Sequence, residues 1–225
     1  TLSGRWRSTE KVKRQSAKVK GKKAKNRKPK AESRASKVLR WRMAGDTAPL
    51  LLLSMPQMAD PNFARSVVLL CDYNDQGAFG LVVNRRLPEP AWQLIKTNPP
   101  IDVNPELRLW MGGPVDLQRA WVLMSEAQGP DDEHREICPG VLLSVSHELT
   151  LQLLQAPPTP RARVIVGYAG WGPGQLDKEL AESAWLTIDV DAGLIFGVPA
   201  EEMWETAIRR LGADPAALQT SSGVH

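Results

Sequence analysis

The stretch Tyr168-Ala-Gly-Trp-Gly-Pro-Gly-Gln-Leu-Asp-Lys-Glu-Leu180 says more about this 225-residue chain than any other. It follows an apolar run, Val164 to Val166, that is typical of a strand. The spacing of Leu176 and Leu180 then indicates a helix. Between strand and helix, glycine occupies every second position: Gly170, Gly172 and Gly174. A glycine-rich passage of this kind is often where backbone amides meet a ligand, so it forms the first candidate site.

The rest of the chain mixes strands with short helices. Strands are expected over Leu50–Ser54, Arg65–Cys71, Ala78–Asn84, Leu107–Trp110, Arg119–Met124, Val141–Val145, Arg161–Val166 and Trp185–Val190. Helices are expected over Glu89–Lys96, His147–Gln155, Gln175–Glu182 and Pro199–Leu211, with Gly212 ending the last of them. The sequence Asn74-Asp-Gln-Gly77 predicts a hairpin turn, and Gln128–Glu136 an acidic surface loop. Because strands and helices do not alternate regularly, we predict a single compact α+β domain.

Charge divides the chain into two unequal parts at Met43. Residues 1–42 hold 17 of the 29 Lys and Arg residues and 2 of the 25 Asp and Glu residues, a balance of +15, which leaves −11 for the remainder. So few large apolar side chains occur in residues 1–42 that they cannot bury enough surface to offset their ordering entropy. We expect a disordered basic tail over 1–42, a folded domain over 43–218 and a frayed C-terminus over 219–225.

The basic tail has three open interpretations. A polybasic run from Lys11 to Lys30 could bind nucleic acid or anionic lipid through counterion release. The tail could instead be an organelle transit peptide, although it is rich in Lys where such peptides favour Arg. It could also lie upstream of the true start or be an appended segment, because Met43-Ala-Gly-Asp would be an ordinary N-terminus.

The number and spacing of the cysteines and the lengths of the apolar runs indicate the cellular compartment of the protein. No apolar run approaches the ~18 residues that span a bilayer, and the tail lacks the apolar core of a secretory signal. The two cysteines, Cys71 and Cys138, form no CxxC motif. Reduced thiols in the cytosol are therefore expected, with Cys71 inert in a buried strand.

Four separated motifs resemble the AlgH (YqgE) family of bacterial proteins over about residues 48 to 218. They are Ser54-Met-Pro-Gln-Met-Ala-Asp-Pro-Asn-Phe63 with Ser66-Val-Val68, Gly77-Ala-Phe-Gly-Leu-Val-Val-Asn84, Gly112-Gly-Pro-Val115 and Gly167-Tyr-Ala-Gly-Trp-Gly-Pro-Gly-Gln-Leu176. This chain has Asp177 where relatives usually carry glutamate. The resemblance implies a compact α+β domain with a split, bifurcated sheet and a small barrel-like element flanked by helices. It also implies a link to regulation, since some members are connected with control of alginate production, but no established reaction.

Two segments supply candidate binding residues besides the glycine-rich passage from Gly170 to Gly174, called the glycine turn below. Asp60, Asn62 and Ser66 could be polar groups of a cleft, and Phe63 is a candidate beside them, although turn formation and capping by Asp60-Pro61-Asn62 is the simpler interpretation. Gly112 and Gly113 are most simply a turn that ends a strand. If these segments converge with the glycine turn, they form a concave patch for a ligand or peptide. Together with Gly170, Trp171, Gly172, Gly174, Gln175, Asp177 and Glu179, they are the candidate site residues.

The glycine turn itself also has a purely structural interpretation. It is neither a P-loop nor a GxGxxG fingerprint, and Asp177 and Glu179 would repel a phosphate, which argues against nucleotide binding. A tight backbone turn with Trp171 packed into the core explains the same residues. In that case Gly172 or Gly174 should adopt a positive φ.

No catalytic, metal or cofactor site is expected. His134 and His147 lack convergent ligands at metal-binding spacing, and Ser146-His147-Glu148 cannot form a triad because adjacent side chains do not converge. The leading hypothesis is a cytosolic, non-enzymatic binding or regulatory protein with an unknown protein or small-molecule partner. One alternative is a small-molecule-binding enzyme that uses the turn with Asp177 or Glu179 as acid or base. The other is nucleic-acid binding through the tail.

Overall fold

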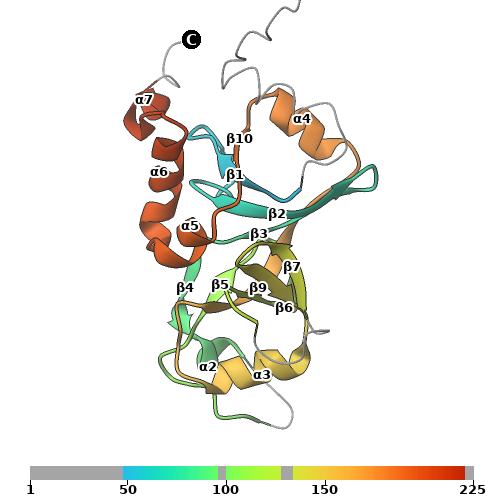
Figure 1. The fold of residues 1–225 in the computed structure, drawn as a ribbon, viewed down its shortest axis with the longest axis vertical. Coiled ribbons are helices and arrows are strands. Elements are labelled where there is room, and N and C mark those ends of the chain that lie inside the picture. Colours follow the sequence, from blue (N-terminus) through green and yellow to red (C-terminus); the bar gives the residue numbers. More distant parts are fainter. Residues whose placement is uncertain (1–47, 96–99, 128–133, 221–225) are drawn as a thin grey trace, which may run out of the picture. The chain divides into compact units, whose positions relative to one another are not determined.

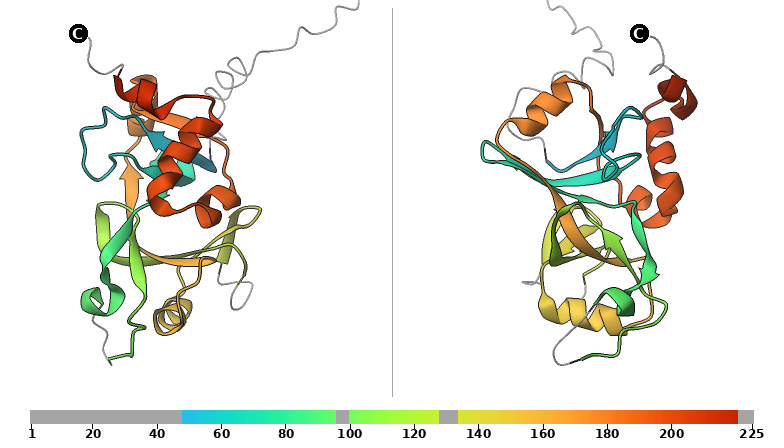
Figure 2. Two further views of the ribbon diagram at one scale, coloured as in Figure 1. Left: turned by 90° about the vertical axis from the view of Figure 1, so that its left-hand side faces the viewer. Right: turned by 180° about the vertical axis from the view of Figure 1, so that it is seen from behind.

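The computed structural model describes residues 48–95, 100–127 and 134–220. The expected tail over 1–42, most of the acidic loop over 128–136 and the last five residues lie outside this range. The described part belongs to one compact unit of the chain. It forms the curled sheet with surrounding helices that Figures 1 and 2 show.

Ten strands build one mostly antiparallel sheet. Their bounds are β1 Leu50–Ser54, β2 Val67–Asn74, β3 Gly77–Val82, β4 Arg86–Pro90, β5 Arg108–Met111, β6 Val115–Met124, β7 His134–Cys138, β8 Val141–Ser144, β9 Ala162–Trp171 and β10 Trp185–Ile188. The order is β10-β1-β2-β3-β9-β6-β8-β7, with β5 pairing both β4 and β9. The pairing of β5 with β9 is parallel, whereas the others among the described strands are antiparallel.

Strand β9 connects the two halves of the sheet. Its first part pairs with β6, from Ala162 to Tyr168, and its last three residues pair with β3. The sheet therefore divides along one long strand, as the expected bifurcated architecture requires. Its curled form confirms the predicted α+β class.

Helices cover the sheet in three places. Their bounds are α2 Ala91–Leu94, α3 His147–Gln155, α4 Gln175–Ala181, α5 Ala192–Gly197, α6 Ala200–Arg210 and α7 Pro215–Thr220. Helices α5, α6 and α7 lie beside β1 and β2, α4 lies beyond β10, and α2 and α3 lie at the opposite end (Figure 1). Of the described helices, none is long and apolar enough to cross a membrane.

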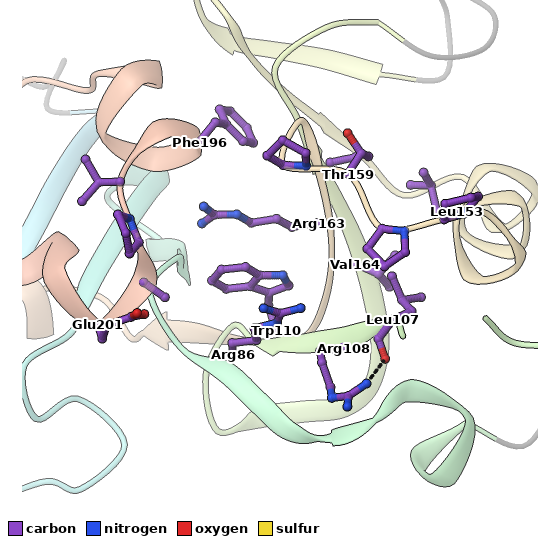
Figure 3. A pocket seen from close by; sticks show the side chains of 17 residues that line it. Arg86, Leu107, Arg108, Trp110, Leu153, Thr159, Arg163, Val164, Phe196 and Glu201 are labelled. Carbon is purple, nitrogen blue, oxygen red and sulfur yellow. Dashed lines mark hydrogen bonds between the residues drawn. The ribbon is translucent and has the colours of Figure 1, made fainter. Parts of the chain in front are cut away.

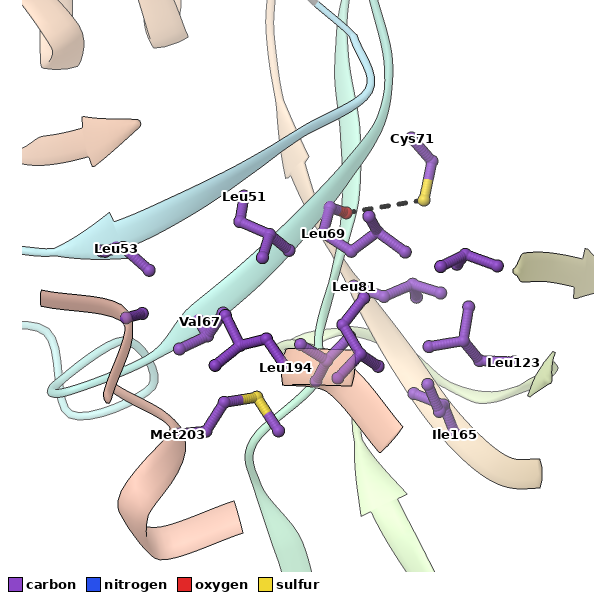
Figure 4. Close-up of a cluster of buried hydrophobic side chains, with 14 of the residues drawn as sticks. Leu51, Leu53, Val67, Leu69, Cys71, Leu81, Leu123, Ile165, Leu194 and Met203 are labelled. Atoms are coloured by element: carbon purple, nitrogen blue, oxygen red, sulfur yellow. Dashed lines mark hydrogen bonds between the residues drawn. The ribbon is translucent and has the colours of Figure 1, made fainter. Parts of the chain in front are cut away.

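The unbroken apolar runs in β1 and β2 reflect burial on both faces. Side chains alternate between faces along a strand. In β1, Leu51 and Leu53 point into a cluster with Met203 and Trp204 of α6, whereas Leu52 points into a second cluster with Trp171 and Leu176. Figure 4 shows the first cluster. Two covered faces leave no position for the polar residues of a half-exposed strand.

Several local expectations needed correction. The strand expected to end at Val166 runs on to Trp171, because the small residues from Gly167 to Gly170 allow neighbouring backbones to approach it. The expected helix at Glu89–Lys96 shortens to α2, since Pro88 and Pro90 belong to strand β4. His134, placed in a loop, begins strand β7. Helix α5 was not expected, and α7 extends through Thr220 of the segment expected to be frayed.

Candidate functional site

Residues 172–174 of the glycine turn connect β9 to α4. Strand β9 ends at Trp171, and Gly174 is the N-cap of α4 with φ +70°. Gly172 N–H donates to Gln175 Oε1 at 3.1 Å, and Gln175 N–H donates back to the Gly172 carbonyl at 3.1 Å. The expected positive φ is thus confirmed at Gly174. The Gly172 amide, a candidate donor to a ligand, is already bonded within the turn.

Glu179 lies at the centre of the hydrogen bonds behind this turn. Its Oε2 accepts the indole N–H of Trp171 at 2.9 Å and that of Trp185 at 2.7 Å. Its Oε1 accepts from Gln175 Nε2 at 2.9 Å. Both indoles are buried, at 6% and 4% exposure. The carboxylate therefore gives two buried donors their acceptor and is not left free for a ligand proton.

Phe63 brings a second candidate segment to the same place. Its ring stacks against Trp171 at 6.4 Å between centroids and meets Trp185 edge-on at 5.6 Å. The two tryptophans contact each other edge-on at 6.0 Å. Such edge-to-face and offset geometries are the favoured ones for aromatic pairs. The loop before β2 is thereby packed against the end of β9 and the start of β10.

The loop that carries Phe63 is a closed turn. Asp60 Oδ1 accepts from the backbone N–H of Asn62 at 2.8 Å and from its side-chain amide at 2.9 Å. The guanidinium of Arg85 donates to the carbonyls of Pro61, Asn62 and Ala64 at 3.0, 2.6 and 3.1 Å. Partial burial lowers the pKa of Arg85, while nearby Asp60 opposes this shift. Asp60 and Asn62 remain exposed, so they form part of the outer surface.

Asp177 is exposed on α4 and is bonded to the neighbouring hairpin. The hydroxyl of Tyr73, near the end of β2, donates to Asp177 Oδ1. Partial burial, followed by this hydrogen bond and the Asp177 charge, raises the pKa of Tyr73 to about 12. The contact joins α4 to strand β2.

Gly112 and Gly113 serve a different part of β9. A Cβ on Gly112 would lie 2.4 Å from the Gly167 carbonyl oxygen, and one on Gly113 would lie 2.3 Å from that of Tyr168. Both glycines are buried, and Gly113 has φ +150°. They permit close backbone approach in the middle of β9, whereas Phe63 contacts its last residue. The structure thus brings together the Asp60 and Gly172 segments of the expected patch.

The surface of this region is formed mainly by short polar and backbone groups. Gly172, Pro173, Gly174, Gln175 and Asp177 are exposed, as are Asp60 and Asn62, while the aromatic rings lie beneath them. Gly170 is exposed as well and has Tyr168 as its neighbour. Within the described residues, no group of three His, Cys, Asp or Glu side chains could hold a metal ion. Asp60, Asp177 and Glu179 each accept hydrogen bonds from within the domain, and only Asp60 and Asp177 of these three are exposed.

A groove elsewhere in the molecule went unnoticed in the sequence. It measures about 460 Å³ and lies between β4, β5, β9, the proline-rich segment after α3 and the start of α6. Arg86, Arg108 and Arg163 line it, together with Trp110 and Phe196 (Figure 3). None of the twelve candidate residues belongs to it. No sequence signal could have found it, since its arginines come from three separated strands.

Arg163 holds the inner wall of the groove. Its side chain is 6% exposed and donates to the carbonyls of Val83 and Ile195. The guanidinium carbon lies 3.9 Å from the ring centroid of Trp110 and 5.5 Å from that of Phe196. Burial, with a smaller contribution from Arg86, lowers the pKa of Arg163 to about 10. The residue links strand β9 to Val83, directly after β3, and to α5, and it remains charged at neutral pH.

The sequence is similar to a large group of bacterial proteins without assigned activity. The AlgH-like family model matches residues 51–216. A UPF0301 protein of Myxococcus xanthus is 40% identical over 180 residues, covering 79% of this chain and 98% of the relative. UPF0301 protein RSc0675 of Ralstonia nicotianae is 36% identical, covering 80% and 99%.

Solved structures agree with the sequence matches. The solution structure of the AlgH protein from Pseudomonas aeruginosa has a TM-score of 0.61 and 33% identity, covering 78% of this chain and 94% of that protein. The crystal structure of protein DIP2367 from Corynebacterium diphtheriae, at 23% identity and a TM-score of 0.57, shares the fold, covering 78% and 91%. The chain is therefore a member of the AlgH-like family.

Proposed function

We propose that this protein acts by binding a partner and not by catalysing a reaction. The observation that supports this most is the engagement of Glu179, whose two oxygens accept from two indoles and an amide. A general acid or base must reach the proton that it transfers. With Glu179 turned inward and Asp177 bonded to Tyr73, the turn offers shape and charge in place of reactive groups.

The partner surface in this proposal consists of Asp60, Asn62, Gly172–Gly174, Gln175 and Asp177. Phe63, Trp171 and Trp185 make a firm base beneath it. A surface on a rigid base loses little conformational freedom on binding, which favours recognition. Its two exposed carboxylates favour a basic partner. Regulation and a cytosolic location belong to the same proposal.

Site-specific photo-cross-linking in the source organism tests this surface. A photoreactive amino acid at Pro173 should give a discrete covalent adduct with one partner. The matched control is the same amino acid at Glu148, which is exposed on α3 at the other end of the described domain (Figure 1). The Asp60→Lys and Asp177→Lys changes should abolish the adduct, whereas Glu148→Lys should leave it intact. Identical adducts from both positions, or none from Pro173, would contradict the proposal.

The enzyme alternative gives a different result in the same cells. If Asp177 acts as acid or base in a reaction of a small molecule, Asp177→Asn removes turnover of that molecule while the Pro173 adduct persists. Nucleic-acid binding through residues 1–42 remains a separate prediction. Phosphate attraction dominates such affinity, so binding should disappear when the tail is deleted and weaken steeply with salt.

A further inference from the structure

We propose that the groove lined by Arg86, Arg108 and Arg163 binds a small organic anion, with a phosphate monoester or carboxylate attached to a flat apolar group. The groove lies on different elements from the partner surface proposed above. Its volume of about 460 Å³ falls in the range of small-molecule sites. Its charge, the fixed position of Arg163 and its apolar walls favour such a ligand.

The groove carries a net positive charge. Three guanidinium groups and one carboxylate, that of Glu201, are the charged groups that line it. The described salt bridges join Arg161 to Glu126, Lys178 to Glu182, Arg209 to Glu205 and Arg210 to Asp191. Within the described part of the chain, the groove arginines therefore pair with no carboxylate. An anion would supply the missing counter-charge.

Arg163 sets the inner end of the groove. Two carbonyls and the Trp110 ring hold its guanidinium in place, and a guanidinium has five N–H donors. Carbonyl oxygens stabilise the cation but carry no net charge. Arg86 lines the same groove as Arg163, and its positive charge contributes to the lowered pKa of Arg163. Two neighbouring guanidiniums are a favourable arrangement for a phosphate or carboxylate.

Arg108 is held at a second side of the groove. Its Nε donates to the Pro88 carbonyl at 3.1 Å, and its Nη1 donates to those of Pro105 and Leu107 at 3.2 and 3.3 Å. Among the described hydrogen bonds, Nη2 of this residue is unused. Arg86 is exposed and completes the cationic set. Because Arg108 and Arg163 are held in place by the fold, an anion would meet donors that lose little freedom on binding.

The remaining walls are largely apolar and include two aromatic rings. They are formed by Trp110, Phe196, Leu107, Leu153, Val164 and the prolines at 157, 158 and 160. Figure 3 shows the Arg163 side chain between the rings of Trp110 and Phe196, with Leu153 and Val164 further along the groove. A bare inorganic anion would leave these walls uncovered. An aromatic or other planar group beside the anion would cover them.

The test uses the full chain with phenyl phosphate as the probe. Residues 1–42 carry 17 Lys and Arg and also attract anions, so the measurement must be specific to the groove. The indole N–H resonance of Trp110, assigned with Trp110→Phe, provides this among the eight tryptophans. It should shift saturably with phenyl phosphate, less with inorganic phosphate and not with benzyl alcohol. Benzoate decides between the two anion types.

Arg86→Gln and Arg119→Gln form the matched variants. Both arginines are exposed. Arg119 lies on β6, whereas Arg86 lies on β4, and the guanidinium carbon of Arg119 is 4.8 Å from the ring centroid of Trp121. Arg86→Gln should raise the dissociation constant measured at Trp110 about tenfold, as expected for the loss of one charge-assisted hydrogen bond. Arg119→Gln should leave it unchanged. An equal effect of both variants, no saturable shift at Trp110, or an equal response to benzyl alcohol would each overturn the proposal.

Discussion

The indole nitrogen of Trp185 lies 2.7 Å from Oε2 of Glu179, so a buried tryptophan of β10 donates to a carboxylate on the preceding helix. Trp171, at the end of β9, donates to the same oxygen at 2.9 Å. One carboxylate thus joins two strands that are not neighbours in the sheet. Because both indoles are buried, the loss of this acceptor leaves donors that water does not readily reach.

Glu179→Gln should destabilise the domain by about 1–3 kcal/mol, measured as the free energy of unfolding in urea. A glutamine has one acceptor oxygen and an amide that donates. If its oxygen accepts from both indoles, the amide faces the Gln175 amide, which loses its acceptor, and the two charge-assisted indole hydrogen bonds become weaker neutral ones; in the other orientation both indoles lose their acceptor. This result would give Glu179 a structural role. An unchanged free energy of unfolding would instead favour a role for Glu179 in ligand or partner binding.

Glu182→Gln is the control for this substitution. Glu182 is the C-cap residue of α4, is exposed and contacts Lys178 at 3.8 Å. An exposed i,i+4 pair contributes about 0.3–0.5 kcal/mol. Equal destabilisation by both variants would mean that charge in this segment matters and the indole contacts do not.

Gly174→Ala and Gly172→Ala should separate backbone strain from side-chain crowding. Gly174 has φ +70°, a conformation that L side chains resist, yet a Cβ there would have nothing within 4 Å. Its replacement should cost about 1 kcal/mol through the backbone alone. At Gly172 a Cβ would meet only Gln175 Oε1, at 3.9 Å, and φ lies outside the positive range. Chemical denaturation should therefore show a small effect at Gly172, and the reverse order would refute this account.

The sequence predicted the sheet and its principal helices well where apolar patterns were strong. Strand β1 and helix α3 have the expected bounds, because unbroken leucines and a capping serine at position 146 are local signals. Strand β4 was missed because its two prolines are poor strand formers. Local signals could not give the pairing of β5 with β9, which depends on residues 55 positions apart in the chain, Trp110 and Ile165.

The candidate site was only partly accessible to sequence analysis. The positive φ of Gly174 could be expected, since glycine before a helix often has this role. The partners of Glu179 could not, because a carboxylate on a helix is usually a solvated charge. Arg163 was equally hidden: a single arginine in an apolar strand gives no sign that carbonyls of Val83 and Ile195 receive its donors.

The two cysteines should react with thiol reagents in a fixed order. Cys71 is 3% exposed, and burial raises its pKa to about 12, so little thiolate forms at neutral pH. Cys138 is half-buried, although burial also raises its pKa. Iodoacetamide at pH 8 should modify Cys138 first, and Cys71 only after urea unfolds the chain. Peptide mass mapping reads both sites, and early labelling of Cys71 would show that β2 opens in the native state.

Tyr73 should keep its proton to unusually high pH. Its pKa is raised from the ordinary 10.0 to about 12, first by partial burial and then by the hydrogen bond to Asp177 and the charge of that residue. Between these two values the folded protein retains a proton that the unfolded chain has lost. Stability contributed by this group is therefore present below pH 10 and lost as the pH rises towards 12.

Absorbance at 295 nm, followed together with circular dichroism to confirm folding, measures this ionisation. The chain has two tyrosines, Tyr73 and Tyr168, so Tyr73→Phe identifies the late transition by removing it. Asp177→Asn should lower the Tyr73 midpoint only part of the way, because burial, the largest cause, remains. In the Tyr73→Phe background, Asp177→Asn should leave the remaining titration unchanged. A wild-type midpoint near 10 for Tyr73 would show that Asp177 does not hold the phenol, and the side-chain hydrogen bond between α4 and β2 would then be absent.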